Sequence, residues 1–186
     1  MNINKQFGLL ANAEVVRSTI DALKKNGMEA EMVESKIEAK MRLLELIPPG
    51  AEVFTQTSET LKEIGVVEEI NESGRFSSVR MKMSEMDRNS QKQEMNRMGA
   101  APEITVGSVH AVSKNGKVII ASNTGSQLPA YAYGAGKVIW VVGVQKIVND
   151  IETGMKRIYE YSLPLESERA RAAYGVEGSS VNKILI

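Results

Sequence analysis

The chain has 186 residues, a length that fits one large domain better than two, and its Lys and Arg residues equal its Asp and Glu residues at 23 each. A net charge of zero excludes a field that would attract nucleic acid or an anionic membrane surface. The absence of cysteine excludes disulfides and iron–sulfur ligation by this chain, and a single histidine, His110, argues against a metal site built on imidazoles.

The start of the chain, MNINKQFGLL, lacks the basic residues, long apolar run and cleavage site of a secretory signal. The longest uninterrupted apolar run, Val138–Val144, is far short of the ~20 residues that a membrane helix needs. We therefore expect a soluble cytoplasmic protein that binds neither a membrane nor nucleic acid and carries no metal or cofactor.

The first predicted element is an N-terminal helix within residues 1–27, because apolar residues recur at helical spacing and stop at Asn26-Gly27. Glu29–Glu34 alternates between apolar and polar residues, which predicts a short strand. Ser35-Lys-Ile-Glu38 is a capping box and predicts the start of a second helix.

Ala51–Thr55 follows as a predicted strand. Thr60-Leu-Lys-Glu63 is a second capping box and predicts another helix start. Phe76–Met83 is compatible with a strand, and the polar stretch Ser84–Met98 with a surface helix or a mobile segment.

Val109–Ser113 and Lys117–Ser122 flank Asn115-Gly116, the strongest short signal for a hairpin. A short helix is expected at Pro129–Gly134. Val138–Val144 is β-branched and apolar on both faces, which predicts a fully buried central strand.

Asn149-Asp-Ile-Glu152 predicts the cap of another helix. Pro164–Tyr174 is expected to form the last helix, ended by Gly175, and Val181–Ile186 a terminal strand. Strands that alternate with helices predict one α/β domain over residues 1–186: three α/β/α layers, a mixed, mostly parallel sheet and an inserted β-hairpin.

The first candidate binding segment follows the predicted strand Ala51–Thr55 and enters a helix. Backbone N–H groups and the helix dipole favour an anion there, and Thr57, Ser58 and Thr60 add hydroxyl donors. An equally weighted alternative is that Ser58 or Thr60 simply caps its own helix.

The second candidate segment lies between two apolar strands. It concentrates small and polar residues: Asn123, Thr124, Gly125, Ser126 and Gln127. Gly125 allows a close backbone approach or a positive φ. The alternative is a tight strand-to-helix turn, with Pro129 in the first helical turn.

His110 is the third candidate, on a strand of the hairpin and flanked by apolar residues. Its alternative role is that of a hydrogen-bonded sheet residue. Because both segments follow strands and precede helices, we expect them to face one cleft, with His110 near its floor and a small carboxylate or phosphate as ligand. The chain contains no nucleophile-elbow, Walker or dinucleotide-binding motif.

Five stretches in order along the chain carry a resemblance to a known family: Gln56–Gly65, Gly107–Val112, Asn123–Pro129, Val141–Val148 and Leu163–Arg169. They resemble the lactate-utilisation (LUD) domain over nearly the whole chain, from about residue 10 to the end. The resemblance implies a fold similar to the superfamily of glucosamine-phosphate deaminases, ribose-phosphate isomerases and CoA transferases. It also implies that Thr57, Ser58 and Thr60 form one wall of a ligand pocket, and Thr124–Gln127 the other.

The resemblance implies a small-anion-binding protein, or a subunit of lactate or organic-acid utilisation that works beside iron–sulfur partner subunits. A stand-alone enzyme acting on a sugar phosphate or CoA ester, and a scaffold protein, remain alternatives, because no acidic cluster or thioester-forming glutamate of the superfamily is visible. A homodimer also stays open. Relatives are expected to continue past Ile186, so we expect a C-terminal extension to be missing.

Overall fold

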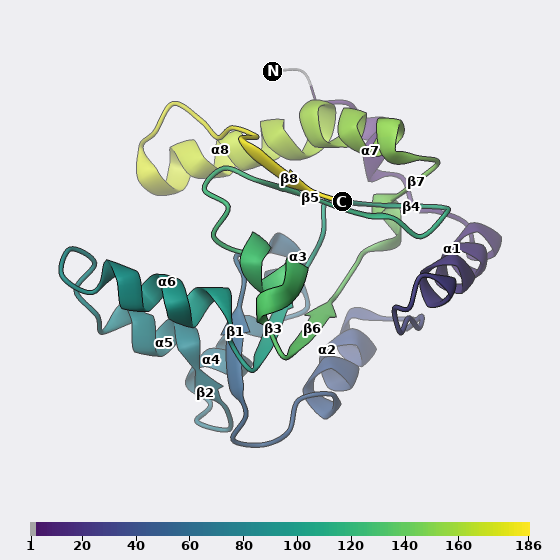
Figure 1. Ribbon diagram of the computed structural model, residues 1–186. Helices are drawn as coiled ribbons and strands as arrows, with labels where there is room; N and C mark the ends of the chain where they lie inside the picture. Colours follow the sequence, from purple (N-terminus) through teal and green to yellow (C-terminus); the bar gives the residue numbers. More distant parts are fainter. Residues whose placement is uncertain (1–2) are drawn as a thin grey trace. The chain divides into compact units, whose positions relative to one another are not determined.

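The computed structural model describes residues 3–186, in which helices and strands are interspersed along the chain (Figure 1). The described residues divide into two compact units. Unit 1 comprises the N-terminal part up to Met32, Val109–Gly125 and Gly143–Ile186, and unit 2 comprises Val33–Ser108 and Ser126–Val142. The predicted α/β fold class is confirmed.

Unit 2 contains a four-stranded sheet in the order β2-β1-β3-β6, and every strand pair in it is parallel. Its elements are α2 (Lys36–Glu45), β1 (Glu52–Thr55), α3 (Glu59–Glu63), α4 (Val67–Glu72), β2 (Ser77–Ser78), α5 (Val79–Ser84), α6 (Lys92–Ala100), β3 (Ile104–Gly107), the π-helical turn η2 (Ala130–Gly134) and β6 (Lys137–Trp140).

Helices cover both faces of this sheet. Successive side chains of a strand point to opposite faces, so each strand packs against helices on both sides. Val53 of β1 is fully buried against Leu43 of α2 and Leu61 of α3. The next residue, Phe54, lies on the opposite face, and a Cβ at Gly99 of α6 would lie 3.3 Å from its ring. Unit 2 therefore has the α/β/α layering that the sequence predicts.

Unit 1 contains a mixed four-stranded sheet in the order β7-β4-β5-β8, with β4 parallel to β7 and β5 antiparallel to both β4 and β8. Its elements are the 3₁₀ turn η1 (Lys5–Gly8), α1 (Ala13–Lys25), β4 (Ala111–Ser113), β5 (Val118–Ser122), the 3₁₀ turn η3 (Val144–Lys146), β7 (Ile147–Val148), α7 (Ile151–Arg157), the π-helical turn η4 (Ile158–Ser162), α8 (Leu163–Tyr174) and β8 (Lys183–Leu185).

The predicted hairpin is β4-β5, and the backbone N–H of Gly116 in its turn donates to the Ser113 carbonyl oxygen at 2.8 Å. The turn is held by α1, because Asn26 Nδ2 donates to the carbonyl oxygens of Asn115 and Gly116. On the sheet of unit 1, Ile119 packs with Ile158 in a small apolar core.

Several helix ends lie where the sequence predicts them. Ser35 accepts a hydrogen bond from the Glu38 N–H and begins α2, and Asp150 accepts one from the Thr153 N–H and begins α7. Gly175 ends α8 in the left-handed conformation, with φ of 66°. No helix within residues 3–186 has both the length and the apolar character needed to cross a bilayer.

The prediction of a central, fully buried strand at Val138–Val144 is wrong. β6 spans only Lys137–Trp140, pairs with β3 alone at the edge of its sheet and is half-buried along most of its length. The run is apolar for a different reason: Ile139 and Val141 pack against the core of unit 2, while Trp140 packs against the ring of Tyr131.

Two further local predictions fail, and a third holds only in part. Glu29–Glu34 forms no strand, because alternation alone does not supply a partner strand. In Phe76–Met83 only Ser77–Ser78 is strand, since the Ser78 hydroxyl accepts from the Met81 N–H and begins α5. The helix expected at Ser84–Met98 begins only at Lys92.

Candidate functional site

The carboxyl ends of the strands in unit 2 meet at a topological switch point. From β1 the chain passes to β2 on one side and then crosses to β3 on the other. In open α/β sheets, ligands bind outside the carboxyl ends of the strands at such a point. The switch point lies between the end of β1 at Thr55 and the end of β3 at Gly107.

Gln56 extends β1 into this edge. Its backbone N–H donates to the Val106 carbonyl oxygen at 2.8 Å, and its buried amide Nε2 donates to Thr105 Oγ1 at 3.0 Å. Because both its backbone and its side-chain amide are hydrogen-bonded, Gln56 places a buried amide group in a fixed position at the switch point.

The segment after Gln56 forms the helix entry that the sequence predicts, with Ser58 as its cap. Ser58 Oγ accepts from the Leu61 N–H at 3.3 Å, whereas Thr60 lies inside α3. The prediction of a capping box that begins at Thr60 is therefore wrong. Because α3 has only five residues, its dipole contributes little to anion binding.

A guanidinium lies at the end of β1. The Thr55 carbonyl oxygen accepts from Arg80 Nε at 2.9 Å and Nη2 at 2.5 Å, and the Arg80 Cζ atom lies 5.5 Å from the centre of the Phe54 ring. Asn71 Oδ1 accepts from the hydroxyls of Thr55 and Ser78 at 3.1 and 2.8 Å. This network places one positive charge, amides and hydroxyls beside the switch point.

At the end of β3, the phenol of Tyr131 fills the space that a side chain at position 107 would occupy. A Cβ at position 107 would overlap the Tyr131 hydroxyl and lie 2.9 Å from Tyr131 Cζ and 3.3 Å from Gln56 Cβ. Position 107 must therefore be glycine for Tyr131 to reach the carboxyl end of β3.

His110, in unit 1, is hydrogen-bonded within its sheet. Its Nδ1 accepts from the Ala121 N–H at 3.1 Å, and its carbonyl oxygen accepts from Arg157 Nη1. Burial, together with the charges of Lys146 and Arg157, lowers the His110 pKa to about 4, and Glu166 acts in the opposite direction. At neutral pH the imidazole is uncharged and carries its proton on Nε2.

The second predicted segment begins in unit 1 as a tight turn. Gly125 has φ of 86°, its N–H donates to Ser122 Oγ at 2.8 Å, and a Cβ there would lie 2.5 Å from Lys183 Cδ. The positive φ that the sequence analysis gives as one possibility for Gly125 is present. Asn123 Oδ1 accepts from Asn182 Nδ2 at 2.9 Å, which ties the turn to the segment before β8.

The candidate residues are divided between the two units. Unit 2 contains Thr57, Ser58, Thr60, Ser126 and Gln127, and unit 1 contains His110, Asn123, Thr124 and Gly125. Their role in ligand binding, and the single cleft expected for them, stay predictions.

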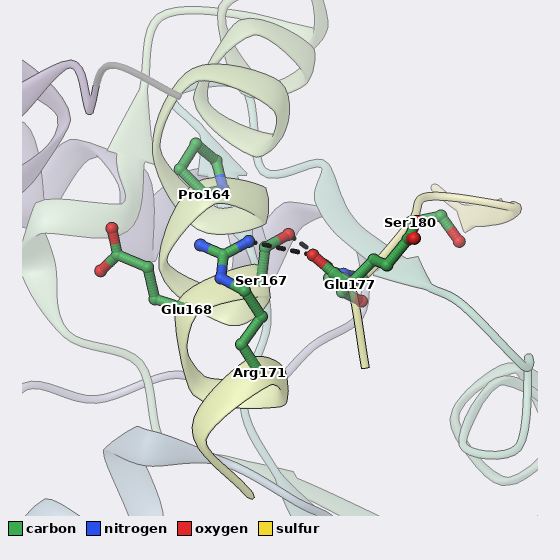
Figure 2. Close-up of a pocket in the computed structure, with 8 residues that line it drawn as sticks. Pro164, Ser167, Glu168, Arg171, Glu177 and Ser180 are labelled. Carbon is green, nitrogen blue, oxygen red and sulfur yellow. Dashed lines mark hydrogen bonds between the residues drawn. The ribbon is translucent and has the colours of Figure 1, made fainter. Parts of the chain in front are cut away.

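Unit 1 also has a polar hollow of about 360 Å³ between α8 and the segment before β8, shown in Figure 2. Arg171 Nη1 donates to the Glu177 carbonyl oxygen at 3.1 Å, and Ser167 Oγ accepts from the Ser179 N–H at 3.1 Å. Both side chains hold the segment in place, so these hydrogen bonds are structural.

Several residues at the switch point escape prediction from the sequence, namely Gln56, Arg80, Gly107 and Tyr131. Arg80 lies in a stretch that was predicted as a strand, and the sequence does not indicate that it contacts Thr55. Gly107 carried a usable signal, because a glycine at the end of an apolar strand often marks a close approach by another group.

Within residues 3–186 no group of three His, Cys, Asp or Glu side chains is arranged to hold a metal ion. The family model described as "LUD domain" matches residues 16–184, which is most of the chain. The chain belongs to the LUD-domain family. A comparison of this LUD-domain chain with curated proteins finds no match.

Proposed function

We propose that this LUD-domain chain binds a small organic-acid anion and acts in lactate or organic-acid utilisation as a cytoplasmic subunit without a redox centre of its own. The observation that carries the proposal is the family match over residues 16–184. Because the chain contains no cysteine, any iron–sulfur cluster of such a system would belong to partner subunits.

The proposed binding site is the switch point of unit 2. Gln56 offers an amide, Arg80 a guanidinium, and Thr57 a hydroxyl close to the end of β1. A guanidinium with neutral donors around it suits a carboxylate better than a cation. The contributions of Ser58, Thr60, Ser126 and Gln127 belong to the same proposal.

A thermal-shift screen tests the proposal. L-lactate or pyruvate at 100 times its dissociation constant is expected to add ~2.7 kcal/mol of stability, which raises the midpoint of thermal unfolding by roughly 5–10 °C. Sodium chloride at equal ionic strength is the control.

Two results would contradict the proposal. Stabilisation by sugar phosphates or CoA esters alone would favour a stand-alone enzyme similar to the deaminases, isomerases and CoA transferases of the superfamily. No stabilisation by any of these ligands would favour a scaffold or interaction protein.

A matched pair of variants tests the site. Arg80→Gln removes the guanidinium beside Thr55, so we expect the organic acid to bind about tenfold more weakly. Arg97→Gln, on the exposed surface of α6, is the control and should leave binding unchanged. Equal binding by the two variants would place the ligand elsewhere.

A further inference from the structure

Tyr131 places a phenol hydroxyl at the switch point of unit 2. The side chain is 7% exposed and comes from η2, and its hydroxyl occupies the space left open by Gly107 at the end of β3. A buried polar group at the edge where α/β sheets bind ligands is a candidate for ligand recognition.

Trp140 lies beside this phenol. It is the last residue of β6, pairs in register with Gly107, and its ring meets that of Tyr131 edge-to-face, with the centroids 5.5 Å apart. Its indole Nε1 is buried and forms no hydrogen bond of normal geometry with the residues described. The phenol oxygen of Tyr131 interacts with it, but in a geometry that leaves this buried N–H only partly satisfied.

The phenol is a hydrogen-bond donor at neutral pH. Burial raises the pKa of Tyr131 above its ordinary value, which outweighs the opposite effects of the Ser108 backbone N–H and the Trp140 indole. Since both of these groups direct an N–H towards the phenol oxygen, the hydroxyl proton of Tyr131 is left to point at another acceptor.

Three neutral groups lie near the phenol. Gln56 is an amide, Ser108 a hydroxyl that donates to the Val141 carbonyl oxygen at 2.6 Å, and Gly107 has no side chain. Neutral O–H and N–H donors match a carbonyl or hydroxyl oxygen, whereas a carboxylate is better matched by a guanidinium.

We propose that Tyr131 is a ligand-binding residue that donates its hydroxyl proton to the C2 oxygen of a small 2-hydroxy or 2-oxo acid, with the indole N–H of Trp140 beside it. The inference rests on the proposed function and adds to it a residue and a substrate feature: the oxygen at C2 is recognised, as well as the carboxylate.

A cycle of protein and ligand changes isolates this contact. Propionate is lactate without its C2 hydroxyl, and Tyr131→Phe is the chain without its phenol oxygen. By titration calorimetry we expect the unsubstituted chain to bind L-lactate or pyruvate about tenfold more tightly than propionate, and Tyr131→Phe to lose this preference. Tyr133→Phe, at a side chain that is 96% exposed on the same turn, is the control and should keep it.

The outcomes separate the two proposals. If Tyr131→Phe keeps the preference, or if the unsubstituted chain binds the three acids equally, the role of Tyr131 is overturned while organic-acid binding stands. If the unsubstituted chain binds none of the three acids, the proposed function fails, and the role of Tyr131 fails with it.

Intrinsic fluorescence supplies a second measurement that needs no variant. Trp140 is the sole tryptophan of the chain, so its emission reports on this position alone. Saturation with L-lactate or pyruvate is expected to change the emission more than saturation with propionate does. Equal emission in the free and saturated chain would overturn the inference, even if Tyr131→Phe fails to fold.

Discussion

At the scale of single residues, neighbouring groups restrict the chemistry of His110 and the residue type at position 107. The Nδ1 atom of His110 already accepts a hydrogen bond from Ala121, so protonation of this nitrogen would break a bond of the sheet. Gly107 is the opposite case, where a missing Cβ admits the hydroxyl of Tyr131.

The pKa of His110 leads to a prediction about stability. Because burial and nearby cations lower the folded-state pKa to about 4, the neutral imidazole favours folding above the unfolded-state pKa near ~6.5. We expect the free energy of unfolding to fall by about 2–3 kcal/mol more in the unsubstituted chain than in His110→Asn as pH drops from ~6.5 to ~4.

The measurement is urea denaturation at several pH values, together with NMR titration of the imidazole. His110 is the only histidine, so its resonances need no assignment by mutation. An imidazole that titrates near ~6.5 in the folded chain would contradict the expected burial.

At the scale of elements, the short helix α3 depends on its cap. Ser58→Ala removes the acceptor of the Leu61 N–H, and we expect it to lower the free energy of unfolding by about 1 kcal/mol in urea denaturation. Ser84→Ala is the control, because that exposed hydroxyl donates only to a carbonyl oxygen of its own helix, and it should change stability by less than ~0.5 kcal/mol. Equal effects would mean that Ser58 does not stabilise α3.

The β4-β5 turn provides a second test at this scale. Gly116 has φ of 77°, and a Cβ there would lie 2.7 Å from the backbone of Ala22 in α1. Gly27 has φ of 81°, but a Cβ at that position would meet no heavy atom within 4 Å. Gly27→Ala should therefore cost about 1–2 kcal/mol through backbone strain alone.

Gly116→Ala should cost more than Gly27→Ala by about 1–3 kcal/mol, since it adds a clash with α1 to the same strain. Thermal or urea denaturation of both variants measures the difference. Equal losses would show that α1 does not pack against the hairpin turn as described.

At the scale of the whole molecule, each unit has an apolar core of its own. Leu61 is fully buried in the core of unit 2, and Ile119 is fully buried in that of unit 1. Either residue replaced by alanine should lower the free energy of unfolding by about 2–5 kcal/mol.

Hydrogen exchange resolves where this stability is lost. Leu61→Ala should reduce amide protection in unit 2 more than in unit 1, and Ile119→Ala should do the reverse, because local openings follow contiguous packing. Uniform loss of protection in both variants would show that the chain opens as one cooperative body.

The sequence by itself determined the α/β class, the hairpin and several helix ends, because each depends on neighbouring residues. Asn115-Gly116 makes its turn from two adjacent residues, and Ser35 and Asp150 cap helices through N–H groups three residues away. Gly125 belongs to the same group, since a positive φ is a local property of the backbone.

Only the tertiary structure decided which groups meet at the switch point. Arg80 reaches Thr55 across 25 residues, and Tyr131 reaches Gly107 from a separate segment of the chain. The same reason explains the error at Val138–Val144: hydrophobicity shows that side chains are covered, but strand order decides whether a strand is central, and β6 has β3 as its sole partner among the described residues. Contacts between distant segments depend on packing that no local pattern records.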